Sequence, residues 1–167
     1  MNTIQAKHIM TKNVVTVDED MPVVDLSEFL LEKMISGAPV LNSEGKLVGV
    51  VSLSDLARTK AEQATIIHEK TKSDFYIKDW DGPVDEEELE GFHLEINEGL
   101  QVGDIMTPLV FSVSEDTPLA EMAEIMSTGR IHRLIVTQED DVVGIVTTMD
   151  ILAVVARGGL PAEETVG

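Results

Sequence analysis

An internal repeat constrains the fold of this 167-residue chain more than any other feature. The stretch AKHIMTKNVVTVDEDMPVVDLSEFLLEKM matches VGDIMTPLVFSVSEDTPLAEMAEIM, and Met10 falls on Met106, 96 residues later. The spacing drops to 95 where GVVSLSD at Gly49 matches GIVTTMD at Gly144, and we place this one-residue difference near the end of the first helix. Two similar units of about 55 residues follow, and repeats this small are expected to cover each other's apolar surface.

Both units show the same order of structural signals. A short β-branched run leads to a proline in the first helical turn, where a missing N–H costs nothing. Apolar residues then recur at helical spacing, namely Val23, Leu26, Leu30 and Met34 in the first unit and Leu119, Met122, Ile125 and Met126 in the second. Two short strands and a closing helix complete each unit. The predicted strands are 14–17, 39–41 and 46–52, with 110–113, 134–137 and 142–148. We therefore expect an α+β fold of two β-α-β-β-α units.

Composition excludes several classes of protein. Hydrophobic residues make up 43% of the chain, as in globular proteins, but no run of about 18 apolar residues and no apolar leader occurs, so we expect a cytoplasmic protein without a membrane partner. The absence of cysteine removes disulfides, zinc–thiolate sites and cysteine nucleophiles. The formal net charge of -19 argues against a nucleic-acid partner, because the chain repels phosphate backbones.

Each unit ends a strand with hydroxyl side chains and a carboxylate. The residues are Ser52, Ser54 and Asp55 in the first unit and Thr147 and Asp150 in the second. A helix N-terminus presents unpaired N–H groups to an anion or a sugar oxygen, and a carboxylate can accept hydrogen bonds from both hydroxyls of a ribose. Met149 replaces the second hydroxyl, so one set lacks a polar contact. The alternative is ordinary helix capping, which uses the same residue types.

A basic cluster occurs in the second unit only, in the stretch GRIHRLIV. Its members are Arg130, His132 and Arg133. Guanidinium groups bind phosphate oxygens through two parallel hydrogen bonds. The matching positions of the first unit, 36–38, carry no charge, so phosphate binding is expected to be lopsided. The alternative is a surface pairing with Glu121 or Glu124.

The paired motifs resemble those of a cystathionine-β-synthase (CBS) domain pair, also called a Bateman module. The motifs are IMT, the proline-led helix, HRLIV and Gly followed by two apolar residues, Ser or Thr, and Asp three positions later. The resemblance covers both units in order and implies tandem CBS domains related by pseudo-two-fold symmetry. We expect repeat 1 at 1–60, an insert at 61–101, repeat 2 at 102–157 and a flexible tail at 158–167.

The resemblance also assigns roles to residues. It implies that Asp55 and Asp150 bind ribose, that the hydroxyls contact ribose or phosphate, and that the His-Arg pair reaches phosphate. It implies clefts shared by the two repeats, in which the Asp of one repeat faces the base slot of the other. The slot residues would be Thr11, Val15 and Ile35 in repeat 1 and Thr107, Phe111 and Ile131 in repeat 2. Plain core packing is the alternative for these six positions.

The insert at 61–101 lies outside the resemblance. It holds Tyr76, Trp80 and an acidic run, DEEELE, and aromatic residues are rare in disordered linkers. We expect a helix continuing over 57–70, an irregular flap at DFYIKDW and a short helix at 85–90. His68 and His93 lack metal-ligand spacing, so we interpret the acidic run as a solvated face and expect no metal.

The sequence therefore predicts a non-enzymatic sensor of AMP, ADP or ATP that requires no cofactor and acts on an unknown effector protein. No nucleophile elbow, phosphate-binding loop or zinc-protease motif occurs, which argues against an enzyme. We expect a homodimer through helix faces carrying Leu26, Leu30, Met34, Met122 and Met126. Two alternatives stay open: a ligand-free dimerisation module, and a module that binds S-adenosylmethionine or NAD.

Overall fold

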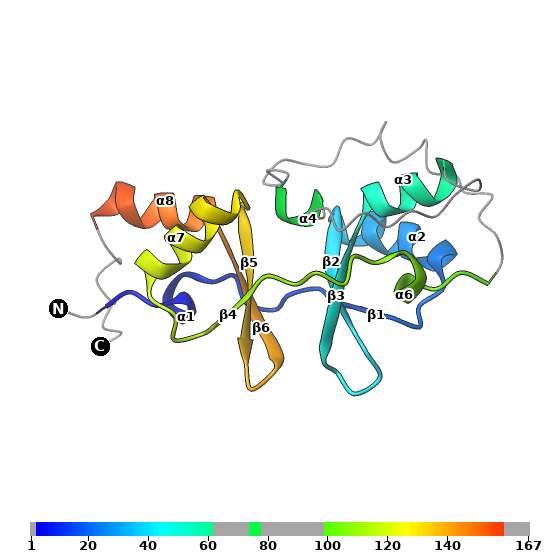
Figure 1. Cartoon of the computed structure of the whole chain (residues 1–167), viewed down its shortest axis with the longest axis horizontal. Coiled ribbons are helices and arrows are strands. Elements are labelled where there is room, and N and C mark those ends of the chain that lie inside the picture. Colours follow the sequence, from blue (N-terminus) through cyan, green and yellow to red (C-terminus); the bar gives the residue numbers. More distant parts are fainter. Residues whose placement is uncertain (1–2, 62–73, 78–98, 159–167) are drawn as a thin grey trace. The chain divides into compact units, whose positions relative to one another are not determined.

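The computed structural model describes residues 3–61, 74–77 and 99–158, which fall into two compact units (Figure 1). The repeat-1 unit spans residues 15–110, and the repeat-2 unit combines residues 111–167 with residues 1–14. Each unit thus contains the segment that precedes the other repeat in the chain. The expected α+β fold of two β-α-β-β-α units is confirmed.

The repeat-1 unit is built on a three-stranded sheet of order β1-β2-β3, in which β2 runs parallel to β1 and antiparallel to β3. Helices α2 and α3 lie side by side in this unit (Figure 1). Its elements are β1 (Val17–Asp18), α2 (Val23–Lys33), β2 (Gly37–Leu41), β3 (Leu47–Ser52), α3 (Leu53–Ala61), α4 (Asp74–Ile77) and α6 (Val102–Ile105).

The repeat-2 unit has the same topology, with strand order β4-β5-β6 and helices α7 and α8 side by side (Figure 1). Its elements are α1 (Ala6–Ile9), β4 (Ser112–Ser114), α7 (Leu119–Gly129), β5 (Arg133–Gln138), β6 (Asp141–Thr147) and α8 (Thr148–Arg157).

The one-residue difference between the repeats lies in the strand hairpin, so its predicted place near the end of the first helix is wrong. Val40 pairs with Gly49 and Val136 pairs with Gly144, and the two valines are 96 residues apart while the two glycines are 95 apart. The hairpin between these paired residues is therefore one residue longer in repeat 1, at 41–48, than in repeat 2, at 137–143. A residue added to a helix would rotate every later side chain by about 100°, whereas a hairpin loop absorbs it.

The predicted dimer surface is also wrong, because four of its five residues are buried in their own units. Leu26, Leu30 and Met122 are 0% exposed and Met126 is 3% exposed. An amphipathic helix has one main apolar stripe, and here that stripe packs on the unit's own core. Only Met34, at the left-handed C-cap of α2, is exposed. Other exposed apolar side chains are Val24 and Leu31 on α2 and Met149, Leu152 and Val155 on α8.

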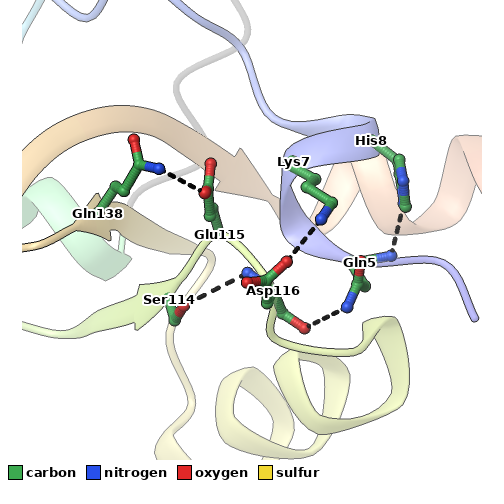
Figure 2. Close-up of polar contacts among 7 residues, drawn as sticks. All are labelled: Gln5, Lys7, His8, Ser114, Glu115, Asp116 and Gln138. Carbon is green, nitrogen blue, oxygen red and sulfur yellow. Dashed lines mark hydrogen bonds and ion pairs between the residues drawn. The ribbon is translucent and has the colours of Figure 1, made fainter.

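The N-terminal arm, residues 3–11, is hydrogen-bonded to the turn between β4 and α7. Backbone bonds join Ala6 N to Thr117 O at 2.9 Å and Leu119 N to Ile4 O at 2.8 Å. Figure 2 shows the Lys7 ammonium donating to Asp116 Oδ1 at 2.6 Å beside the Gln5 amide, which donates to the Asp116 carbonyl. This hydrogen bond raises the pKa of Lys7 above its usual value. The arm therefore completes the repeat-2 unit.

The arm ends in the IMT motif, which docks on the edge of β6. Thr11 N donates to Ile145 O at 2.9 Å and Ile145 N donates to Thr11 O at 3.0 Å. The Met10 side chain lies over Gly144, where a Cβ atom would stand 2.5 Å from Met10 Sδ. Gly144 therefore leaves the space that the methionine fills.

Residues 99–107 form the corresponding arm of the repeat-1 unit. Val50 and Thr107 exchange backbone hydrogen bonds of 3.0 and 2.8 Å. A Cβ atom on Gly49 would stand 2.7 Å from Met106 Sδ and 2.8 Å from Thr107 O. In each unit, the methionine of the IMT motif thus packs against the glycine of the strand motif.

We predict that Gly49→Ala destabilises the protein by about 1–3 kcal/mol, because the new methyl group overpacks against a backbone oxygen that cannot move alone. Urea unfolding measures the change. Gly129→Ala is the matched control, since a Cβ atom there meets only ordinary contacts, the nearest at 3.5 Å. A Gly49→Ala variant as stable as the parent protein would contradict the packing role.

Deleting residues 3–11 should loosen strands that lie far away in the sequence. The deletion removes the edge partner of β6, so hydrogen exchange should speed up in β5 and β6. Strands β2 and β3 should keep their protection, because their own edge partner is the 99–107 arm. Faster exchange confined to β2 and β3 would show that the arm belongs to the other unit.

Candidate functional site

Strand β6 passes into helix α8 through a reciprocal cap. Asp150 Oδ2 accepts hydrogen bonds from Thr147 N at 2.7 Å and from Thr147 Oγ1 at 2.9 Å, and Thr147 Oγ1 accepts from Asp150 N at 3.3 Å. These bonds are the helix cap that the sequence offered as an alternative to ligand binding. The cap uses Oδ2, and within residues 3–61, 74–77 and 99–158 no hydrogen bond engages Oδ1 of Asp150. Both residues are partly exposed.

Arg133 lies directly across from this cap. It begins β5 and pairs with Thr147 of β6, and opposite residues of antiparallel strands project from the same face of the sheet. The carbonyl of His132 accepts a hydrogen bond from Thr148 N at 2.9 Å, which ties the basic stretch to the start of α8. The structure thus brings Arg133, Thr147 and Asp150 to one end of the sheet. Arg130 is exposed at the left-handed C-cap of α7, with φ 50°.

The repeat-1 counterpart of this cap is buried. Asp55 is 4% exposed and Ser52 is 0% exposed. Asp55 Oδ2 accepts from Ser52 N at 2.7 Å and from Ser52 Oγ at 3.0 Å, while Arg58 Nη2 donates to Oδ1. Ser54, on the first turn of α3, is partly exposed. Both oxygens of Asp55 are therefore engaged by the chain itself.

Burial raises the pKa of Asp55, although the hydrogen bonds from Ser52 and the Arg58 charge oppose the rise. A group whose folded-state pKa lies above its unfolded value binds its proton more readily in the folded chain. That contribution to stability is present below the unfolded pKa and is lost as the pH rises through the folded pKa. Ionised Asp55 is thus held at a cost in solvation, and its bonds to Ser52 and Arg58 offset part of that cost.

The two caps differ at two matching positions. Ala153 stands where α3 has Arg58, so the three-residue spacing that pairs Arg58 with Asp55 has no equivalent on α8. Gly37 pairs with Ser52 as Arg133 pairs with Thr147, so Gly37 is the repeat-1 counterpart of Arg133. One sheet end therefore carries a cation beside a partly exposed cap, and the other carries a glycine beside a buried one.

Of the six predicted base-slot residues, the two threonines lie in the unit of the other repeat, and the other four lie in the unit of their own repeat. Thr11 lies beside β6 in the repeat-2 unit, and Thr107 lies beside β3 in the repeat-1 unit. Each threonine therefore joins the sheet that carries the Asp of the other repeat. Val15 and Ile35 stay in the repeat-1 unit, where Ile35 packs against the core. Ile131 is buried in the repeat-2 unit, and the Phe111 carbonyl accepts from Ile135 N. Their contact with a base stays a prediction.

Sequence reasoning missed two features near the Asp55 cap. The pairing of Asp55 with Arg58 could have been found from its spacing, because residues three apart are neighbours on a helix. The first residues of the predicted flap, 74–77, instead form helix α4, with Phe75 and Tyr76 buried. Helix α3 is described to Ala61. The expected helix beyond it, the expected helix at 85–90 and the two histidines of the insert lie outside the described residues.

No described helix is long and apolar enough to cross a membrane. Within the same residues, no cluster of three or more acidic or histidine side chains could hold a metal ion.

Comparisons with known proteins identify the repeat. The model of the CBS domain family matches residues 6–62 and 102–157. Uncharacterized protein MJ1426 of Methanocaldococcus jannaschii is 33% identical over 157 residues, covering 87% of this chain and 88% of that protein. The inosine-5'-monophosphate dehydrogenase of the same organism is 31% identical over 149 residues, which cover 89% of this chain but only 23% of the enzyme.

Solved structures show the same fold. The structure of CBSX2 in complex with AMP matches with a TM-score of 0.62 and 25% identity, covering 92% of this chain and 96% of that one. The CBS domain pair of protein MJ0100, in complex with 5'-methylthioadenosine and S-adenosyl-L-methionine, matches with a TM-score of 0.62 and 22% identity, covering 94% and 99% of the two chains. Two family matches and two sheets of the same topology lead to one conclusion: the chain belongs to the CBS domain family and carries its domains as a tandem pair.

Proposed function

We propose that this chain is a regulatory sensor that binds an adenine nucleotide and is not itself an enzyme. The observation that carries the proposal is the placement of Arg133 opposite Thr147, beside the Asp150 cap. A cation, a hydroxyl and a carboxylate then meet at one end of a sheet. These are the three groups that a nucleotide needs, for its phosphate and for its ribose.

The chemistry of each group fits the part of the nucleotide that it would bind. A guanidinium binds phosphate oxygens through charge-assisted hydrogen bonds. Asp150 retains Oδ1, which can accept a hydrogen bond from a ribose hydroxyl while Oδ2 holds the cap. In a chain of net charge -19, an anionic ligand binds only where a local cation overcomes the repulsion. Arg133 supplies that cation.

The relatives support an adenosine ligand. CBSX2 was solved with AMP, and the MJ0100 pair was solved with 5'-methylthioadenosine and S-adenosyl-L-methionine. All three molecules contain adenosine, which the ribose carboxylate would recognise. S-adenosylmethionine has no phosphate for Arg133, so we favour AMP, ADP or ATP over it, and NAD, which carries two phosphates, is the other alternative. The effector is proposed to be another protein that senses the occupied site.

The first test of this function separates phosphate from adenosine. Arg133→Ala should weaken AMP binding at least about tenfold, because a charge-assisted hydrogen bond contributes roughly 1.5–3 kcal/mol. Adenosine binding should change little, since adenosine lacks the phosphate. Titration calorimetry with both ligands measures the difference.

Arg157→Ala is the matched control, since it removes an exposed arginine from the far end of α8. It should leave both ligands unaffected. Asp150→Asn, which keeps an oxygen for the cap but removes the charge, should weaken AMP and adenosine alike. If Arg133→Ala bound AMP as tightly as the parent protein, the proposal that Arg133 binds the phosphate would be refuted.

A ligand-free dimerisation module is the second candidate, and one observation favours it. Met149, Leu152 and Val155 are 53%, 56% and 67% exposed. Their spacing of three places them along one side of α8. The matching positions of α3 hold Ser54, Ala57 and Lys60, so this apolar stripe belongs to repeat 2. We propose that the stripe, rather than the buried residues named from the sequence, forms a homodimer contact.

Leu152→Glu should convert a dimer into a monomer, because a charge buried against an apolar helix face is costly. Sedimentation at tens of micromolar protein measures the mass. Leu109→Glu, which charges an exposed leucine outside the helices, is the control and should leave the mass unchanged. A parent protein that sediments as a monomer would refute the contact.

A further inference from the structure

Helix α4 of the insert buries its two aromatic side chains completely. Phe75 is 2% exposed and Tyr76 is 0% exposed, and their rings meet edge to face at 5.0 Å and 88°. Helix α4 packs next to β3 in the repeat-1 unit (Figure 1). A four-residue helix is not stable alone, so these side chains hold it against the sheet.

The aromatic pair lies at the end of the sheet that carries the Asp55 cap. A Cβ atom on Gly37 would stand 3.1 Å from Phe75 Cδ2 and 3.3 Å from Ser52 Cα. Ser52 pairs with Gly37 in the sheet and donates its hydroxyl to Asp55. Phe75 therefore covers the strand residue next to the cap.

The matching position in the repeat-2 unit is Arg133, the proposed phosphate ligand. Gly37 has no side chain there, and any side chain would meet Phe75 and, at 2.7 Å, the carbonyl oxygen of Val51. The insert thus fills with an aromatic ring the space into which the side chain of this position would extend. Phosphate recognition is removed at this end and replaced by apolar packing.

The Asp55 carboxylate has also lost the properties of a ribose ligand. It is 4% exposed, one oxygen is held by Ser52 and the other is held by Arg58. Asp150, by contrast, is partly exposed and has an oxygen outside the cap. Two independent features, the aromatic cover and the Arg58 pair, close the same end of the same sheet.

We infer that Phe75 and Tyr76 form an internal plug over the Ser52–Asp55 end of the repeat-1 sheet, so that each chain binds one adenosine ligand, at Asp150, instead of two. The inference rests on the proposed function for its ligand. The plug itself is a property of the folded chain. It makes the insert a determinant of stoichiometry.

Tyr76 tests the plug without any ligand, because it is the only tyrosine of the chain. Tetranitromethane nitrates exposed tyrosines, so the folded protein should resist the reagent and the urea-unfolded protein should react. The protection should persist in saturating AMP, since AMP at Asp150 leaves the plug in place. Ready nitration of the folded protein, with or without AMP, would overturn the plug.

Calorimetry with AMP and with adenosine tests the stoichiometry. The parent protein should bind one ligand per chain, and Arg58→Ala/Phe75→Ala/Tyr76→Ala should bind a second adenosine, because it removes both the aromatic cover and the Arg58 pair from the Ser52–Asp55 end. Phe29→Ala, which truncates a half-buried phenylalanine of α2 in the same unit, is the control and should keep one ligand. Circular dichroism checks that both variants fold.

The ligand count of the parent protein decides the inference even if the triple variant does not fold. Two ligands per chain in the parent would overturn the inference and leave the proposed function standing. No binding of AMP or adenosine by the parent or the variant would overturn the proposed function, and with it the stoichiometry. One ligand per chain with a protected Tyr76 supports both.

Discussion

The contact between a methionine and a glycine holds each sheet to its arm. Met10 fills the space over Gly144, and Met106 fills the space over Gly49. The neighbouring threonines then add a short edge strand through paired backbone hydrogen bonds. Because each arm precedes the other repeat in the chain, this contact also sets which residues share a unit. Thr11 reaches the Asp150 sheet, and Thr107 reaches the Asp55 sheet, as parts of these arms.

The same scaffold supports two sheet ends with different chemistry. Thr147 and Asp150 repeat the bonds of Ser52 and Asp55, so the backbone and the cap are conserved between the two copies within this chain. The differences lie in the side chains around the caps. Arg58 and the aromatic pair of α4 close one end, while Arg133 gives the other a cation. A duplicated strand-to-helix junction can thus serve as structure in one copy and as a candidate site in the other.

Much of the fold could be predicted from the sequence, because each hydrophobic and capping pattern occurs in both repeats. The strand and helix order and the caps at Asp55 and Asp150 follow from local spacing, which both copies share. The dimer surface could not be predicted in the same way. Helical periodicity says that Leu26 and Met122 share an apolar face with their neighbours, but it does not say whether that face meets a sheet or a second chain.

The candidate site was predicted less completely, for a related reason. The types of residue at Arg133, Thr147 and Asp150 were visible, but their adjacency depends on strand register, which places Arg133 opposite Thr147. The role of α4 could not be predicted because Phe75 and Tyr76 lie outside both repeats. Their positions in the sequence do not indicate which residue they cover. Gly37 was the available signal, since a glycine at the start of a strand often marks the close approach of another group.

The exchanged arms have a consequence for the order in which the protein is made. Thr11 finds its partner at Ile145, which is made 134 residues later. The repeat-1 sheet is likewise incomplete until Thr107 has been synthesised. The repeat-1 unit is a continuous stretch, residues 15–110, so all its partners are present once its arm has been made. The repeat-2 unit must instead join segments far apart in the sequence, and such contacts form late and slowly. The repeat-1 unit can therefore be completed first during synthesis, while residues 3–11 wait for β6.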